Sequence, residues 1–462
     1  MRSVKPFLPW MVWGVATFSY GIAVVNRASL AALGPAAQEH FGIDATTLSI
    51  FVMIQLAVYA GMQIPVGMLL DRIGSSRMIL SGMLLMVVGQ TLMATVSDVR
   101  LAILARVLVG AGDACTFTSL MRMLPDWFSV RQLPVVSQLT GLIGQAGQLV
   151  SITPLAFVVS SFGWASGFLG IAGIGLLVGI LGALVLRDRP GVGTVAETLT
   201  GRLGRISREA RSLGADEPTG AFMRPPATEM LPVIADSRVP GLSIWTRGRR
   251  LLSIPGTRLA YWMHFTSPFA LTVFVLLWGT PFLTGGIGLS TEQASGLLNL
   301  VIVSSMAAGL LLGPLSSRFV ERRVTLYLVI TFTIIALWVA VIVWPTTPPL
   351  WLIIVLVVAM PFGGPASMIA FEVARSHTPR SFSGFSTGLV NTGGFTSALC
   401  VVLLIGLVLD LQGAGSPEHY SLRAFQTAFA VQIPFWALGV TMILIERVRT
   451  KRWMELHGRR LR

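Results

Sequence analysis

The 462-residue chain is 53% hydrophobic and only 12% charged, with a mean hydropathy of +0.75. Because soluble domains carry about 25% charged residues, this composition excludes an ordinary soluble protein and indicates a membrane protein. The net charge of +14 does not indicate nucleic-acid binding, since the basic residues lie between the apolar segments. The two cysteines, Cys115 and Cys400, lie inside apolar stretches, so we expect neither a disulfide nor a metal site.

Apolar segments long enough to cross a bilayer, about 20 residues each, follow one another along the chain. We predict an all-α membrane protein of twelve transmembrane helices, built as two pseudo-symmetric halves of six helices. The predicted spans cover residues 8–34, 47–69, 77–96, 100–122, 134–159, 163–186, 259–283, 291–314, 324–344, 349–373, 383–409 and 424–445. The first of these is too long to be the core of a signal peptide.

Arginine and lysine mark alternate loops, and this bias predicts the orientation of the chain in the membrane. The loops after spans two, four, eight and ten contain two or three arginines each, and both chain ends are basic. The loops on the opposite side contain few basic residues. Both termini are therefore predicted to be cytoplasmic, and we expect the protein in the cell (inner) membrane of a bacterium.

A long polar segment separates the two halves. Its proline, glycine, arginine and acidic residues cannot bury much apolar area, so most of it is expected to be a linker. Residues 196–213 and 242–256 have the pattern of basic amphipathic helices that suit the inner membrane surface, or of a solvated linker with helical propensity. The predicted organisation is an N-terminal half (1–187), a cytoplasmic linker (188–258), a C-terminal half (259–446) and a basic cytoplasmic tail (447–462).

Three ionisable side chains lie inside predicted spans one and four: Arg27, Arg106 and Asp113. Such groups are functional candidates because ionised side chains are costly at membrane depth. At 1.5 Å per residue, Arg27 and Arg106 lie about 10 Å below the outer surface, and Asp113 about 10 Å deeper than Arg106. We predict that the two guanidiniums bind an organic anion and that Asp113 carries a coupled proton. The alternative is a structural Arg–Asp pair that only ties helices together.

Further polar residues recur at helical spacing in the N-terminal half. Gln55, Tyr59 and Gln63 form one stripe on span two, and span five carries several glutamines beside glycines. As a set these residues outline a hydrophilic cavity, although each alone also fits an interhelical hydrogen bond. In the other half, we expect His264 to bond a neighbouring backbone group. The predicted substrate-binding residues are Arg27, Arg106, Tyr20, Asn26, Tyr59, Gln63, Gln145, Gln148 and Asn391.

The loops after spans two and eight repeat one another. "GMLLDRIGSSRMIL" at 67–80 and "GPLSSRFVERRVTL" at 313–326 share glycine, leucine and two arginines at the same offsets. A repeat at the same point of two six-helix halves is typical of a transporter that arose by duplication.

The first of these loops resembles the G-x-L-x-D-R-x-G-x-x-R signature of the major facilitator superfamily, and the six-plus-six layout resembles that family over nearly the whole chain. In that family the first glycine allows close helix approach, and the aspartate pairs with basic groups of the opposing half. The resemblance thus implies that Asp71, Arg72 and Arg77 latch the cytoplasmic side. An ordinary basic loop is the alternative. The implied gating residues are Gly67, Asp71, Arg72, Gly74 and Arg77.

Within the superfamily, "NRASLAALGP" in span one and "RVLVGAGDA" in span four are similar to the organic anion:cation symporter branch. That branch has Asp-Arg in the first span, and in the fourth an arginine followed seven residues later by an acid. The resemblance implies anion binding by Arg27 and Arg106 and proton coupling by Asp113. Asn26 replaces the family's aspartate, so one titrating group is missing.

These observations predict a secondary active transporter that moves a small organic anion into the cell by proton symport with alternating access. We expect a monomer in the lipid bilayer, with the anion and protons as partners. Two alternatives are proton-coupled efflux of drugs or metabolites, and a membrane sensor that does not transport. The sequence has no nucleophile–base pattern, metal cluster or nucleotide-binding loop, so neither an enzyme nor a cofactor is expected.

Overall fold

The computed structural model is all-helical, as expected for a chain whose backbone polar groups must be satisfied inside lipid. Among the residues that the structure describes, eleven helices are long and apolar enough to cross a membrane. The predicted span at 134–159 is covered by α6 (Leu133–Ile152) and α7 (Pro154–Phe162). The structure describes residues 7–43, 45–152, 154–200, 244–379, 382–414 and 419–456.

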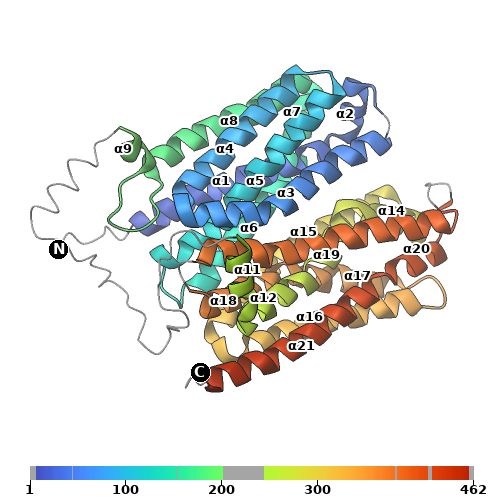
Figure 1. Cartoon of the computed structure of the whole chain (residues 1–462). Helices are drawn as coiled ribbons and strands as arrows, with labels where there is room; N and C mark the ends of the chain where they lie inside the picture. The colour runs from blue at the N-terminus through green and yellow to red at the C-terminus, as the bar shows by residue number, and fades with distance from the viewer. Residues whose placement is uncertain are drawn as a thin grey trace, which may run out of the picture. The chain divides into compact units, whose positions relative to one another are not determined.

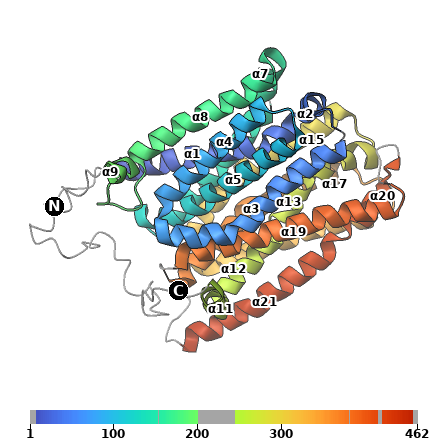
Figure 2. The same ribbon diagram turned by 45° about the horizontal axis from the view of Figure 1, so that its top comes forward.

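The helices form two compact units, and each corresponds to one half of the chain except for a short exchanged segment. Unit 1 consists of Met1–Leu133, Leu142–Arg238 and Pro379–Gly388. Its remaining helices are α1 (Leu8–Ala32), α2 (Gly34–Phe41), α3 (Ala45–Ile73), α4 (Ser75–Thr95), α5 (Val99–Trp127), α8 (Trp164–Val185) and α9 (Val195–Leu199). Within it α4 packs against α5 and α8, while α5 also contacts α1 and α3 (Figures 1 and 2).

The contact between α4 and α5 depends on two glycines. A Cβ atom on Gly112 would lie 2.5 Å from the carbonyl oxygen of Gly82, and the reverse substitution would be equally close to Gly112. Small residues of this kind let the backbones of membrane helices touch. α5 is therefore held in the interior of unit 1, which is why both of its mid-membrane charged residues, Arg106 and Asp113, are fully buried.

Unit 2 consists of Pro134–Gly141, Val239–Thr378 and Leu389–Arg462. Its helices are α11 (Ile244–Ser253), α12 (Pro255–Thr266), α13 (Phe269–Val273), α14 (Gly279–Pro281), α15 (Thr291–Arg318), α16 (Arg323–Val343), α17 (Leu350–Ala359), α18 (Gly363–His377), α19 (Ser383–Leu411), α20 (Leu422–Phe429) and α21 (Gln432–Leu456). α12 packs against α18 and α21, and an aromatic core that includes Phe274, Trp338 and Phe429 fills the interior.

Several spans are less regular than the sequence pattern predicts. The seventh breaks at Pro268, which lacks a backbone N–H, and then contains π-helical turns on both sides of α14. The twelfth is divided into α20 and α21, and α21 continues beyond the predicted end at residue 445. In the linker, α9 and α11 are helices, while residues 201–213 of the predicted amphipathic segment lie outside the described residues.

Candidate functional site

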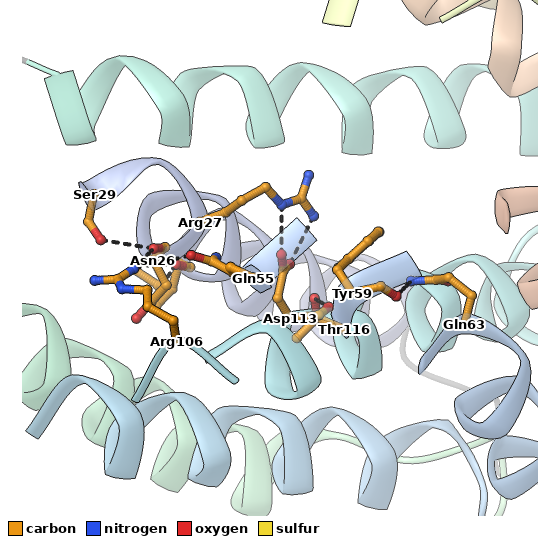
Figure 3. A network of polar contacts seen from close by, with 10 residues as sticks. Asn26, Arg27, Ser29, Gln55, Tyr59, Gln63, Arg106, Asp113 and Thr116 are labelled. Carbon is orange, nitrogen blue, oxygen red and sulfur yellow. Dashed lines mark hydrogen bonds and ion pairs between the residues drawn. The ribbon is translucent and has the colours of Figure 1, made fainter. Parts of the chain in front are cut away.

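An ion pair at membrane depth joins α1 to α5 in unit 1. Arg27 donates from Nε to Oδ2 of Asp113 at 2.6 Å and from Nη2 to Oδ1 at 2.9 Å (Figure 3). The side chain of Asp113 is 0% exposed and that of Arg27 is 23% exposed. The guanidinium also packs on the ring of Tyr59, 4.5 Å from its centroid. This two-pronged geometry is the strongest arrangement of an Arg–carboxylate pair, and it occupies one edge of the guanidinium.

Arg106 lies in a different environment. Its side chain is 0% exposed, and its Nη1 donates to Oε1 of Gln55 at 3.2 Å and to the backbone carbonyl of Asn26 at 3.5 Å. The ring of Phe168 lies 5.9 Å from the guanidinium carbon. Within the described part of the chain, Nε and Nη2 of Arg106 have no hydrogen-bond partner, and no carboxylate forms an ion pair with them. Arg106 is thus a buried guanidinium without a counter-ion among the described residues of unit 1.

Arg106 lies at a depth similar to that of Arg27, because its Nη1 reaches the carbonyl of Asn26, the residue next to Arg27. However, the two guanidiniums point in different directions, Arg27 toward Asp113 and Arg106 toward Gln55 (Figure 3). Consecutive residues of a helix project about 100° apart, so a side chain beside Asn26 meets a different face of α1 than Arg27 does.

The polar stripe of α3 faces the charged residues. Gln55 contacts Arg106, Tyr59 contacts Arg27, and all three stripe residues are buried. Gln63, the third, accepts a hydrogen bond from Oγ1 of Thr118 at 2.7 Å. Gln63 therefore forms the interhelical bond that the sequence analysis offered as an alternative to ligand binding.

The remaining predicted binding residues fall in both units. Tyr20 is half-buried in unit 1, stacks near Phe117, and packs so closely on Gly144 that a Cβ there would lie 2.5 Å from its ring. Gln145 and Gln148 on α6 are half-buried, and Oε1 of Gln145 has no partner among the described residues.

The C-terminal half contributes two polar residues to unit 2. Asn391 is buried on α19. His264 accepts a hydrogen bond at Nδ1 from the backbone N–H of Gly394 at 3.2 Å, as expected for a histidine that satisfies a neighbouring backbone group. Among the described residues, no group of three His, Cys, Asp or Glu side chains could hold a metal ion.

Asp71 at the end of α3 caps the start of α19. Its carboxylate accepts hydrogen bonds from the backbone N–H groups of Gly384 at 2.8 Å and Phe385 at 3.0 Å. Arg122 of α5 lies 3.7 Å away. In this conformation the carboxylate of Asp71 therefore contacts backbone amides of α19, which lies in the other half of the sequence, and a cation of its own half, Arg122. The implied pairing with basic groups of the opposing half stays a prediction. Unsatisfied amides and the positive end of the helix dipole explain why a carboxylate binds there.

The other residues of the loop signature are two glycines at close contacts and two exposed arginines. A Cβ on Gly67 would lie 2.7 Å from the carbonyl oxygen of Gly384, so the glycine is required for this close approach. Gly74 has a φ of +90°, and a Cβ there would overlap the carboxylate of Asp188. Arg72 and Arg77, which were expected to join the latch, are exposed and form no ion pair within the described ranges.

A related contact in unit 2 was not among the predicted site residues. Oε1 of Glu372 on α18 accepts hydrogen bonds from Ser137 of α6 at 3.2 Å and from Arg375 at 2.5 Å. Nearby, Nε2 of Gln138 donates to the carbonyl of Pro365 at 2.7 Å. The Glu-x-x-Arg spacing on α18 is the sequence signal that could have identified this pair.

Membrane helices in two units, an internal repeat and paired charges at membrane depth define a secondary transporter. The chain belongs to the Major Facilitator Superfamily, whose family profile matches residues 16–402. The family indicated by the loop signature is thus confirmed, and the protein is a membrane transporter of that family, not an enzyme.

Individual relatives agree with the branch indicated by the sequence. A probable galactarate/D-glucarate transporter of Bacillus subtilis is 24% identical over 89% of this chain and 87% of its own length. A probable galactarate/D-glucarate transporter of Pseudomonas putida is 25% identical over 89% of this chain and 86% of its own. The crystal structure of the Escherichia coli fucose:proton symporter matches with a TM-score of 0.63 at 17% identity, covering 94% of this chain and 99% of that one. The last likeness confirms the all-α, twelve-helix fold.

A double-mutant cycle measures the strength of the ion pair. Asp113→Asn and Arg27→Gln should each lower the thermal stability in detergent, because each leaves one charge of the pair at membrane depth without its partner. The free energy of unfolding lost in the double variant should be smaller than the sum of the two single losses, by about 0.5–3 kcal/mol. Asp410→Asn, at an exposed position of α19, serves as the matched control and should have little effect. Strictly additive losses would contradict an energetic coupling of the pair.

Proposed function

We propose that this protein is a secondary active transporter that carries a small organic anion into the cell by proton symport with alternating access. The observation that carries the proposal is the two-pronged bond between Arg27 and Asp113. While Asp113 is ionised, it competes with a substrate carboxylate for the same edge of the guanidinium. Protonation of Asp113 removes that competitor, so the proton and the anion each favour the binding of the other.

Arg106 supports the anionic nature of the substrate. Its two unpartnered nitrogens, Nε and Nη2, lie at a depth similar to that of Arg27 and have no counter-ion among the described residues. A substrate anion that reaches this guanidinium compensates its buried charge and accepts charge-assisted hydrogen bonds from it. Two relatives that align over most of their length are probable galactarate/D-glucarate transporters, so sugar acids are the first substrates to test.

The contacts at the predicted cytoplasmic ends of the helices supply a gate. Asp71 binds the start of α19, and Gln138 of α6 binds the backbone of α18. In alternating access these bonds break when the cytoplasmic side opens and re-form when it closes. Hydrogen bonds to backbone groups suit this role, because each contributes only about 1–3 kcal/mol and can be exchanged for water.

Uptake by proteoliposomes tests the proposed function. The purified protein is reconstituted and offered sugar acids, dicarboxylates, sugar phosphates and neutral drugs, with and without an inwardly directed proton gradient. We expect accumulation of an organic anion that increases when the outside is made acidic. Transport of neutral drugs alone, or no flux of any solute, would contradict the proposal in favour of efflux or of a sensor.

The proton-coupling role of Asp113 gives a variant with a specific defect. Asp113→Asn should abolish accumulation driven by the pH gradient, because the amide cannot bind the coupled proton. Exchange of labelled for unlabelled substrate across the same vesicles should persist, since exchange needs no net proton movement. Gradient-driven uptake that survives unchanged would show that another group carries the proton.

Arg106 has a separate prediction. Arg106→Gln should weaken substrate binding by about 10- to 100-fold, the loss expected for one charge-assisted hydrogen bond. Arg100→Gln, at the exposed start of the same helix, is the matched control and should bind like the wild type. Binding is measured by the concentration of anion that half-saturates exchange. Equal values for all three proteins would remove Arg106 from the binding site.

A further inference from the structure

The charges in the interior of unit 1 do not balance. Away from the helix ends, the described spans of this unit contain three ionised side chains: Arg27, Arg106 and Asp113. Arg27 and Asp113 neutralise each other, and Arg106 has no carboxylate partner among the described residues. The empty site therefore carries one net positive charge when Asp113 is ionised and two when it is protonated.

Asn26, beside Arg27 on α1, does not offset the charge of Arg106. The side chain of Asn26 is buried, donates to the carbonyl of Ile22 at 2.7 Å, and has no partner for Oδ1 in the described chain. Its backbone carbonyl is in reach of Arg106. Because the side chain at position 26 is an uncharged amide, it adds no counter-ion to the cluster, and the charge is left to be neutralised by the substrate.

The contacts given above between this cluster and the described helices around it involve no further carboxylate or guanidinium. α1 contributes Tyr20, α3 contributes Gln55 and Tyr59, and α8 contributes the ring of Phe168. On α5 the thiol of Cys115 lies near Asp113 but donates to the backbone carbonyl of Ala111. Within the described part of unit 1, the net charge of the site is thus set by Asn26, the two arginines and Asp113.

We infer that the charge of the substrate sets the proton coupling: dianions, such as sugar dicarboxylates, are carried with one proton, and monoanions are carried with none. The inference rests on the proposed function. A loaded site in the membrane interior is most stable when its net charge is zero. A dianion reaches neutrality only if Asp113 is protonated, because the site then carries two positive charges. A monoanion reaches neutrality while Asp113 stays paired with Arg27.

The experiment compares two substrates that differ in one carboxylate. D-glucarate and D-gluconate are offered to proteoliposomes between about pH 7 and 8, where both are fully ionised. The membrane potential is clamped at zero with potassium and valinomycin. For each substrate, the opposing anion gradient that stops net flux is measured at a fixed pH gradient. We expect a tenfold proton gradient to balance an about tenfold gradient of D-glucarate and to leave D-gluconate flux unaffected.

A variant tests the role of Asn26 directly. Asn26→Asp adds a carboxylate to the cluster, so each substrate should require about one proton more than in the wild type. Ser160→Asp adds the same charge at an exposed position of α7. It should leave the number of protons carried per anion unchanged for both substrates. If Asn26→Asp does not fold, Gln55→Glu places the carboxylate on the side chain that already contacts Arg106 and should produce the same change.

Equal proton dependence for the two substrates, or an unchanged number of protons per anion in both acidic variants, would overturn the inference while leaving anion transport intact. The absence of any anion flux in the wild type would instead refute the proposed function itself. The inference is supported if the number of protons carried per anion is higher for the dianion than for the monoanion, and higher again in Asn26→Asp.

Discussion

The low polarity of the membrane interior is the constraint on which the rest of this site depends. An ionised side chain is stable there only when an opposite charge or several hydrogen bonds replace its water. Asp113 meets this requirement through both of its oxygens, which Arg27 occupies. Arg106 meets it only in part, through one side-chain amide and one backbone carbonyl. The difference divides the cluster into a satisfied pair and an unsatisfied cation, and an anion is the ligand that such a cation favours.

The internal repeat explains how each unit acquires a segment from the other half of the chain. Gly67 packs against the start of α19, and its repeat partner Gly313 lies 3.3 Å, measured from an added Cβ, from Val135 at the start of α6. Both contacts use a glycine to admit a neighbouring helix. The repeat is not complete, because Asp71 corresponds to Ser317, and unit 2 instead uses Gln138 and Glu372 to hold the exchanged helix. The two halves therefore share the close glycine contact, but different polar residues hold the neighbouring helix in each.

The sequence was sufficient for the fold because hydropathy, loop charge and the repeat report properties of whole segments. It also identified Arg27, Arg106 and Asp113, since ionised residues in apolar helices are rare enough to stand out. Directions of side chains were less accessible: depth along a helix follows from 1.5 Å per residue, but which neighbour a guanidinium contacts depends on how helices rotate about their axes. For the same reason the backbone partners of Asp71 were missed, because an N–H group at a helix start has no signature in the side-chain sequence.

Two helices extend from the charged cluster to the contacts of Asp71, and they differ in where a proline interrupts them. α5 is one helix from Val99 to Trp127, and its one internal proline, Pro125, lies beyond Arg122, so no proline interrupts it between Asp113 and Arg122, beside Asp71. α3 carries Tyr59 and Asp71 but contains Pro65 between them, where one backbone hydrogen bond is missing. Between these residues α5 is therefore the stiffer connection, whereas α3 is weakest against bending at Pro65. The part of α3 that holds Asp71 and the start of α19 can then change its angle without disturbing the packing of Tyr59 and Gln55 around the arginines.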